Sequence, residues 1–184
     1  MPNIANILTM SRIASIPLIA GMLFFEDDII RWITLALYVV ACITDFFDGY
    51  IARRMHQVSA LGRFLDPIAD KLVVAAILMA MTATTQIAGW VVLPAMIILC
   101  REIMVSGLRE YLADLKVGVP VSMLAKWKTT VQMVALGVLI VGGSGPDWFP
   151  TQMIGEGLLW IAAGLTLVTG YDYLRIGLRH MGVS

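Results

Sequence analysis

Long apolar stretches alternate with short polar connections along the whole chain. Six stretches are long enough to form helices that cross a bilayer, which takes about 20 residues. These stretches lie at residues 8–25, 30–49, 67–86, 90–112, 122–141 and 153–176. The pattern predicts an all-α, polytopic membrane protein with six transmembrane helices, formed by a single domain over residues 1–184.

The segment that precedes the first span is more polar than a span should be. Between Pro2 and Arg12, apolar residues recur at helical spacing, with Asn3, Asn6 and Thr9 between them. Such a pattern predicts a short N-terminal helical segment that lies along the membrane interface before the chain turns inward. The segment has no small-residue cleavage site after its apolar run, so we expect it to be retained rather than removed as a signal peptide.

Basic residues indicate the orientation of the six spans. Arg31 is the only basic residue near one set of helix ends, and most of the others lie near the opposite set. Because Lys and Arg are enriched in cytoplasmic loops, both termini and the site described below are predicted to face the cytoplasm across the inner membrane. A five-span alternative, with the first segment lying flat, would place Arg175, Arg179 and His180 outside, against this rule.

Composition supports the membrane prediction and limits the function. Hydrophobic residues make up 59% of the chain and charged residues 14%, whereas soluble domains are about one quarter charged. Lys and Arg total 13, as do Asp and Glu, so the formal net charge is zero. This balance argues against a polybasic nucleic-acid binder. Cys42 and Cys100 both lie in apolar stretches without metal or disulfide spacing.

Four aspartates are expected to converge near the cytoplasmic interface. Asp45 and Asp48 share a helix face at the end of the second span, and Asp66 and Asp70 share one at the start of the third. Four carboxylates this close cannot all be ionised without compensating cations. Two hard divalent ions would compensate them and could grip a pyrophosphate. Any single aspartate could instead cap a helix, and Asp66-Pro67 is a good helix start.

Small and basic residues accompany these carboxylates. Gly49 and Gly62 lack side chains, which would let a nucleotide approach the backbone closely. Arg53 can neutralise phosphate charge through two parallel hydrogen bonds.

Together these positions form a long motif, D-x2-D-G-x2-A-R-x8-G-x3-D-x3-D, that the chain matches throughout. It resembles the signature of the CDP-alcohol phosphotransferases, a family of six-helix membrane enzymes, usually dimers, that use Mg²⁺ or Mn²⁺. The resemblance implies that two metal ions are held by Asp45, Asp48, Asp66 and Asp70, and that Asp70 takes the proton from the attacking alcohol. It also implies a CDP-binding site formed by Asn6, Thr9, Asp48, Gly49, Ala52, Arg53 and Gly62.

A second polar cluster points to the acceptor alcohol. Glu102, Ser106 and Arg109 form one stripe along the fourth span. Together with Lys126 and Lys128 of the next span, Arg101 and Arg109 could form a pocket that binds a phosphate on the acceptor. Alternatively, the lysines could reflect only the cytoplasmic bias, with Glu102 neutralising a nearby arginine; this alternative suits Lys116 and Lys128 better than Arg101 and Arg109.

An anion pocket suits glycerol 3-phosphate or inositol phosphate as the acceptor. The stretch R-E-I-x2-S-G-L-R-E, followed by K-W-K-T-x2-Q, resembles the phosphatidylglycerophosphate synthase branch of the family. That resemblance implies transfer of a phosphatidyl group from CDP-diacylglycerol to glycerol 3-phosphate, within the lipid bilayer. Two alternatives remain open: inositol phosphate as the acceptor, or a cation-dependent transporter that uses the same carboxylates.

Overall fold

The computed structural model describes residues 4–55, 60–115, 117 and 123–180. Side chains are described for these residues except at 4–9, 45–55, 60–64, 66, 67, 179 and 180. The described chain is helical and contains no strand, which confirms the all-α prediction.

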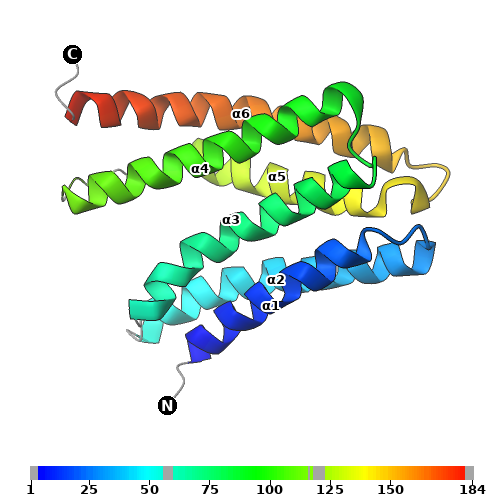
Figure 1. The fold of residues 1–184 in the computed structure, drawn as a ribbon, viewed down its shortest axis with the longest axis horizontal. Coiled ribbons are helices and arrows are strands. Elements are labelled where there is room, and N and C mark those ends of the chain that lie inside the picture. Colours follow the sequence, from blue (N-terminus) through cyan, green and yellow to red (C-terminus); the bar gives the residue numbers. More distant parts are fainter. Residues whose placement is uncertain (1–3, 56–59, 116, 118–122, 181–184) are drawn as a thin grey trace.

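Six α-helices and two short 3-10 turns make up the described chain (Figure 1). The α-helices are α1 (Ile4–Met22), α2 (Asp28–Met55), α3 (Ala60–Ala83), α4 (Val92–Asp114), α5 (Met123–Val141) and α6 (Thr151–His180). The turns are η1 (Gly89–Val91), which leads into α4, and η2 (Gly142–Ser144), which follows α5.

The helices pack as two groups of three that meet along one side. Helix α1 packs against α2 and α3, while α6 packs against α4 and most extensively against α5. Contacts of α2 with α5 and of α3 with α4 join the groups. The first turn of α1 and the last turn of α6 lie at the same end of the bundle (Figure 1), as expected for helices that alternate in direction.

The core that holds the groups together is apolar. Ile77 and Met81 of α3, Ile98 of α4 and Leu136 of α5 are at most 1% exposed. Large apolar side chains also cover the outside of the bundle, among them Trp90, Trp148, Met79 and Met153. An exterior of this kind is suited to contact with lipid rather than water.

Three helical segments of the described residues are long and apolar enough to cross a membrane. They are Gly89–Asp114, Met123–Ser144 and Thr151–Leu178, and Met10–Met22 forms a shorter apolar helix. This finding supports a membrane protein, and the count of six spans stays a prediction.

Two helix boundaries near the site differ from those predicted. Helix α2 continues to Met55 and α3 begins at Ala60, whereas the apolar pattern ends the second span at 49 and starts the third at 67. The length of an apolar stretch indicates only how much of a helix can lie in the hydrocarbon layer. Both helices continue through polar residues beyond that part, so the apolar pattern underestimates their length. Helix α1 is also continuous from Ile4 to Met22, so the described chain has no turn between an interfacial segment and the first span.

The opposite end of the bundle is closed by polar contacts. Asp27 caps α2, because its Oδ1 accepts hydrogen bonds from the backbone N–H groups of Ile29 and Ile30 at 2.9 and 3.1 Å. Gln152 of α6 donates to the backbone carbonyl of Gln86, which follows α3, at 2.8 Å. These contacts fix the closed end, and the helices diverge toward the other end (Figure 1).

Candidate functional site

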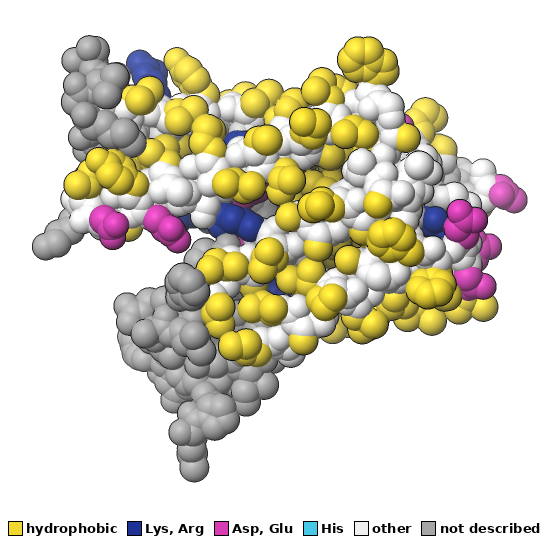
Figure 2. Space-filling view, viewed as in Figure 1, with side chains coloured by type: hydrophobic (Ala, Val, Ile, Leu, Met, Phe, Trp, Pro, Cys, Tyr) yellow, Lys and Arg dark blue, Asp and Glu magenta, His cyan; other side chains and the backbone are white. Residues whose placement is uncertain are grey.

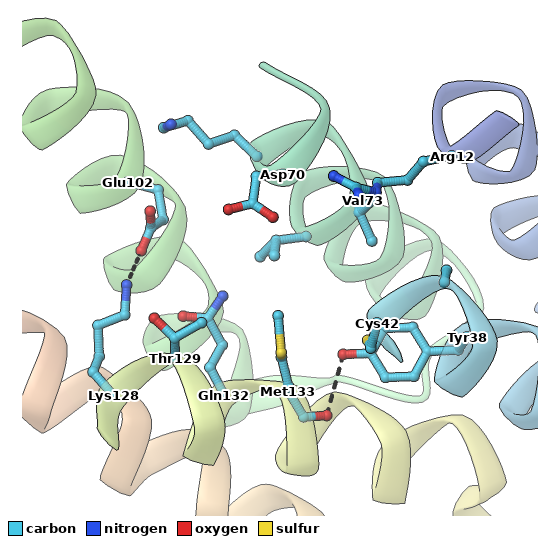
Figure 3. Close-up of a pocket in the computed structure, with 13 residues that line it drawn as sticks. Arg12, Tyr38, Cys42, Asp70, Val73, Glu102, Lys128, Thr129, Gln132 and Met133 are labelled. Carbon is cyan, nitrogen blue, oxygen red and sulfur yellow. Dashed lines mark hydrogen bonds and ion pairs between the residues drawn. The ribbon is translucent and has the colours of Figure 1, made fainter. Parts of the chain in front are cut away.

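A cavity lined by both charged and apolar side chains lies inside the bundle, where five helices meet. We call it the central cavity (Figure 3). The residues that line it are Arg12, Tyr38, Ala41, Cys42, Asp70, Lys71, Val73, Val74, Glu102, Lys128, Thr129, Gln132 and Met133. Figure 3 shows Asp70 on α3 facing this space, with Thr129 and Gln132 rising toward it from α5.

A second, more open cavity continues from the first between α3, α4, α5 and α6. We call it the side cavity, and its lining includes Arg101, Val105, Ser106, Arg109, Glu110 and Tyr173. Asp70, Lys71, Glu102, Lys128 and Thr129 line both cavities. Figure 2 shows a notch at this end of the bundle with Lys and Arg side chains at its base. A small anion could therefore enter from this side and reach Asp70.

Glu102 of α4 is the partner of two buried cations. It forms an ion pair with Lys128 of α5, and its Oε1 lies 3.4 Å from Nη1 of Arg101. The side chains of Lys128 and Arg101 are 6% and 8% exposed. One carboxylate against two cations leaves this wall with a positive charge. Cytoplasmic enrichment of lysine alone does not explain why the side chain of Lys128 is buried.

Residues of helix α6 hold the Arg101 side chain in place. Nη2 of Arg101 donates a hydrogen bond of 2.9 Å to the hydroxyl of Thr169, which lies one helical turn before Tyr173. The guanidinium carbon lies 5.8 Å from the centre of the Tyr173 ring, within range of a cation–π interaction. Gly170 leaves room for the arginine stem, because a Cβ at that position would lie 3.1 Å from its Cγ.

An apolar groove lies beside the central cavity, between α2 and α5. Its lining includes Leu35, Val39, Val134, Gly137 and Val138. Three residues, Tyr38, Cys42 and Met133, line both the groove and the central cavity. The Tyr38 hydroxyl donates a hydrogen bond of 3.1 Å to the backbone carbonyl of Met133, which ties α2 to α5 there (Figure 3). The polar chemistry and an apolar, lipid-like surface are therefore adjacent.

The structure gathers some of the predicted site residues. Asp70 lies where the cavities join, and the predicted anion-binding residues Arg101, Arg109 and Lys128 line the side cavity. Lys126 is exposed and is not among the lining residues of either cavity. The side chains of the remaining predicted residues lie outside the described ones: Asn6, Thr9, Asp45, Asp48, Gly49, Ala52, Arg53, Gly62 and Asp66.

Among the described side chains, no three His, Cys, Asp or Glu residues are close enough to hold a metal ion together. Asp70 is the one predicted metal ligand whose side chain belongs to that part of the chain. Asp66 comes four positions earlier on the same helix, and Asp45 comes three positions after the cavity residue Cys42. By helical register, these positions are one turn away from residues that line the central cavity.

The sequence alone assigns no role to two of the lining residues, Gln132 and Tyr38, although Gln132 is the last position of the stretch K-W-K-T-x2-Q. Gln132 is 3% exposed and Tyr38 is likewise buried, and both line the central cavity. Spacing could have indicated that Gln132 belongs to the site, because it comes four residues after Lys128 and the two share a face of α5. A single glutamine or tyrosine in an apolar span is more often a packing residue, and burial beside a cavity becomes visible only once the helices are assembled.

Fold and site together define a helical membrane protein with a carboxylate and a cationic wall around an internal cavity. The family model described as CDP-alcohol phosphatidyltransferase matches residues 2–168. The chain belongs to this family.

Its relatives are similar over nearly their full length. A CDP-diacylglycerol–glycerol-3-phosphate 3-phosphatidyltransferase of Rickettsia bellii (strain RML369-C) is 46% identical over 173 residues, which cover 94% of each chain. Proteins of the same name from Cereibacter sphaeroides (strain ATCC 17023) and Salmonella choleraesuis (strain SC-B67) are each 38% identical. The matches cover 97% of each chain for the former, and 94% of this chain and 93% of the relative for the latter.

Proposed function

We propose that this protein transfers the phosphatidyl group of CDP-diacylglycerol to the 1-hydroxyl of sn-glycerol 3-phosphate. The oxygen of that hydroxyl forms a bond to the lipid-linked phosphorus. The bond from this phosphorus to the bridging oxygen breaks, and CMP leaves with the electron pair. The hydroxyl proton passes to Asp70, and phosphatidylglycerophosphate remains in the membrane. The names of the relatives support this assignment.

The observation that carries the proposal is the position of Asp70. Its carboxylate belongs to the lining of both cavities, one of which has a cationic wall while the other adjoins an apolar groove. A soluble phosphorylated alcohol and a lipid could therefore approach the same carboxylate from different sides. A general base must reach the proton that it removes, and Asp70 is accessible from both cavities.

The donor set fits divalent metal ions. Mg²⁺ and Mn²⁺ prefer carboxylate oxygens, and the sequence offers four carboxylates, Asp45 and Asp48 in α2 and Asp66 and Asp70 in α3. When bound, two such ions would neutralise the pyrophosphate and stabilise the charge that develops at phosphorus.

The nucleotide and the acyl chains are proposed to occupy neighbouring sites. Asn6, Thr9, Asp48, Gly49, Ala52, Arg53 and Gly62 are the proposed CDP-binding residues. The apolar groove between α2 and α5 is suited to an acyl chain, since it is lined by aliphatic and aromatic side chains and faces outward from the bundle. This arrangement would place the lipid-linked phosphorus near the wall formed by Tyr38, Cys42 and Met133.

The phosphate of the acceptor is proposed to bind in the side cavity. Arg101, Arg109 and Lys128 supply positive charge there, against Glu102. Lys126 is adjacent to the lining residue Ala125 and would add positive charge at the mouth. Binding of the phosphate would draw Arg101 and Lys128 partly away from Glu102, which compensates their charge when the site is empty.

The proposal includes a cellular arrangement. The cationic bias of the sequence supports a site and both termini on the cytoplasmic side of the inner membrane. Family resemblance further implies a homodimer, which mass measurement of the purified protein in nanodiscs would test.

The testing experiment is CMP release by the purified protein in detergent with CDP-diacylglycerol and Mg²⁺. We expect rapid release with glycerol 3-phosphate and little with inositol phosphate or without an acceptor. Chelation should stop release, and added Mg²⁺ or Mn²⁺ should restore it. Release with inositol phosphate alone would change the assigned acceptor, and no release with any acceptor would favour the transporter alternative.

A further inference from the structure

Among the described residues, the oxygen of the buried Gln132 amide has no hydrogen-bonding partner. The side chain is 3% exposed, and Oε1 has no hydrogen-bonding partner in the described structure. A buried acceptor left without a hydrogen bond is unfavourable and is rare in folded proteins. Gln132 also lines the central cavity together with Asp70, and Figure 3 shows it rising from α5 toward that space. The free acceptor is therefore available to a bound molecule.

The position of Gln132 on α5 suggests which group of the acceptor molecule it contacts. Lys128 precedes it by one helical turn on the same face of α5, about 6 Å along the axis. An acceptor with its phosphate near Lys128 and its reacting hydroxyl near Asp70 would lie along this face. The group between those two ends of glycerol 3-phosphate is the carbon that carries the secondary hydroxyl.

We propose that Gln132 selects a polyol phosphate as the acceptor, because its amide oxygen accepts a hydrogen bond from the secondary hydroxyl of glycerol 3-phosphate. This inference rests on the proposed function and adds the residue that distinguishes a polyol from a simple alcohol phosphate. A neutral amide suits the task better than a carboxylate, since its oxygen accepts a hydrogen bond from the hydroxyl without repelling the phosphate or Asp70. A site built to hydrogen-bond a substrate hydroxyl discriminates strongly against analogues that lack it.

The test compares glycerol 3-phosphate with 3-hydroxypropyl phosphate, which keeps the phosphate and the primary hydroxyl and lacks the secondary one. In the wild-type protein we expect kcat/KM to be about 10- to 100-fold lower for the analogue. The Gln132→Met variant should lose a similar factor with glycerol 3-phosphate and change less than about threefold with the analogue. Discrimination between the two acceptors would then nearly disappear.

Two further variants separate recognition from folding. Gln132→Asn keeps the amide but withdraws its oxygen by one methylene, so it should also lose most of the discrimination. Thr130→Val, on the exposed side of the same helix, should leave the wild-type ratio unchanged. Thermal stabilisation by CDP-diacylglycerol would show that each variant is folded.

Each result decides the inference. Equal use of both acceptors by the wild-type protein would overturn it without any variant, as would full discrimination by a folded Gln132→Met protein. CMP release from neither acceptor would instead count against the proposed function.

Discussion

Lys128 on α5 and Glu102 on α4 form an ion pair across the two cavities that surround Asp70. The same carboxylate lies 3.4 Å from Arg101, so one anion serves two cations that are more than 90% buried. Ion pairs between spans are costly to bury and mark functional positions in membrane proteins. Here the pair joins two helices of the same packing group, α4 and α5, at the wall of the proposed acceptor site.

Removal of the shared carboxylate should destabilise the bundle. We expect Glu102→Gln to leave Arg101 and Lys128 facing each other without compensation and to lower the free energy of unfolding by about 3 kcal/mol. Thermal unfolding in detergent measures the change. The double variant Glu102→Gln, Lys128→Met removes one of the two cations as well, and should recover at least half of the loss. A double variant as unstable as Glu102→Gln alone would contradict this explanation.

The position of Arg101 should control affinity for the acceptor. In Gly170→Ala, the added Cβ would lie 3.1 Å from Arg101 Cγ and 3.4 Å from its Nε, and would displace the guanidinium. We expect KM for glycerol 3-phosphate to rise about fivefold, equivalent to about 1 kcal/mol. Steady-state kinetics with saturating CDP-diacylglycerol would measure it. Gly164→Ala on the same helix is the matched control, because a Cβ there meets no atom within 4 Å; equal effects at both positions would argue against a role for Arg101.

Filling the apolar groove should weaken binding of the lipid substrate. We expect Val138→Trp, between α2 and α5, to raise KM for CDP-diacylglycerol about tenfold, since losing the contacts of two methylene groups costs about 1.6 kcal/mol. KM for glycerol 3-phosphate should stay within about twofold, because its phosphate is proposed to bind in the side cavity, whose lining does not include Val138. Leu167→Trp adds the same bulk at an exposed position of α6 and should change neither constant. An unchanged lipid KM in Val138→Trp would place the acyl chains elsewhere.

Much of the fold could be predicted from apolar length alone, because each helix that crosses a bilayer must bury its backbone polar groups along about 20 residues. The ends of α2 and α3 were less predictable, since both helices continue into polar sequence at Met55 and Ala60. The roles of the carboxylates stay predictions from their spacing and their family motif; of the four, Asp70 is the one whose side chain is described, and it lines both cavities.

Arg101 and Lys128, the buried cations beside Glu102, illustrate what the sequence alone could not predict. The pattern indicated Arg101 and Arg109, but the burial of Lys128 depends on Glu102 of a different helix, and that pairing follows from how α4 packs beside α5. Gln132 ends the stretch K-W-K-T-x2-Q, but the sequence assigned it no role, because spacing relates it to Lys128 while only assembly relates it to Asp70. Contacts between helices, rather than the pattern within each, determine these parts of the site.

The central claim is that Asp70 takes the proton of the acceptor alcohol during phosphatidyl transfer. The most direct test is the rate of CMP release by Asp70→Asn with CDP-diacylglycerol and glycerol 3-phosphate, together with direct measurement of CDP-diacylglycerol binding. Asparagine keeps the shape of the side chain but removes the base, so we expect turnover to fall at least about 1000-fold while the lipid still binds. Turnover near that of the wild-type protein in a folded Asp70→Asn variant would contradict the account.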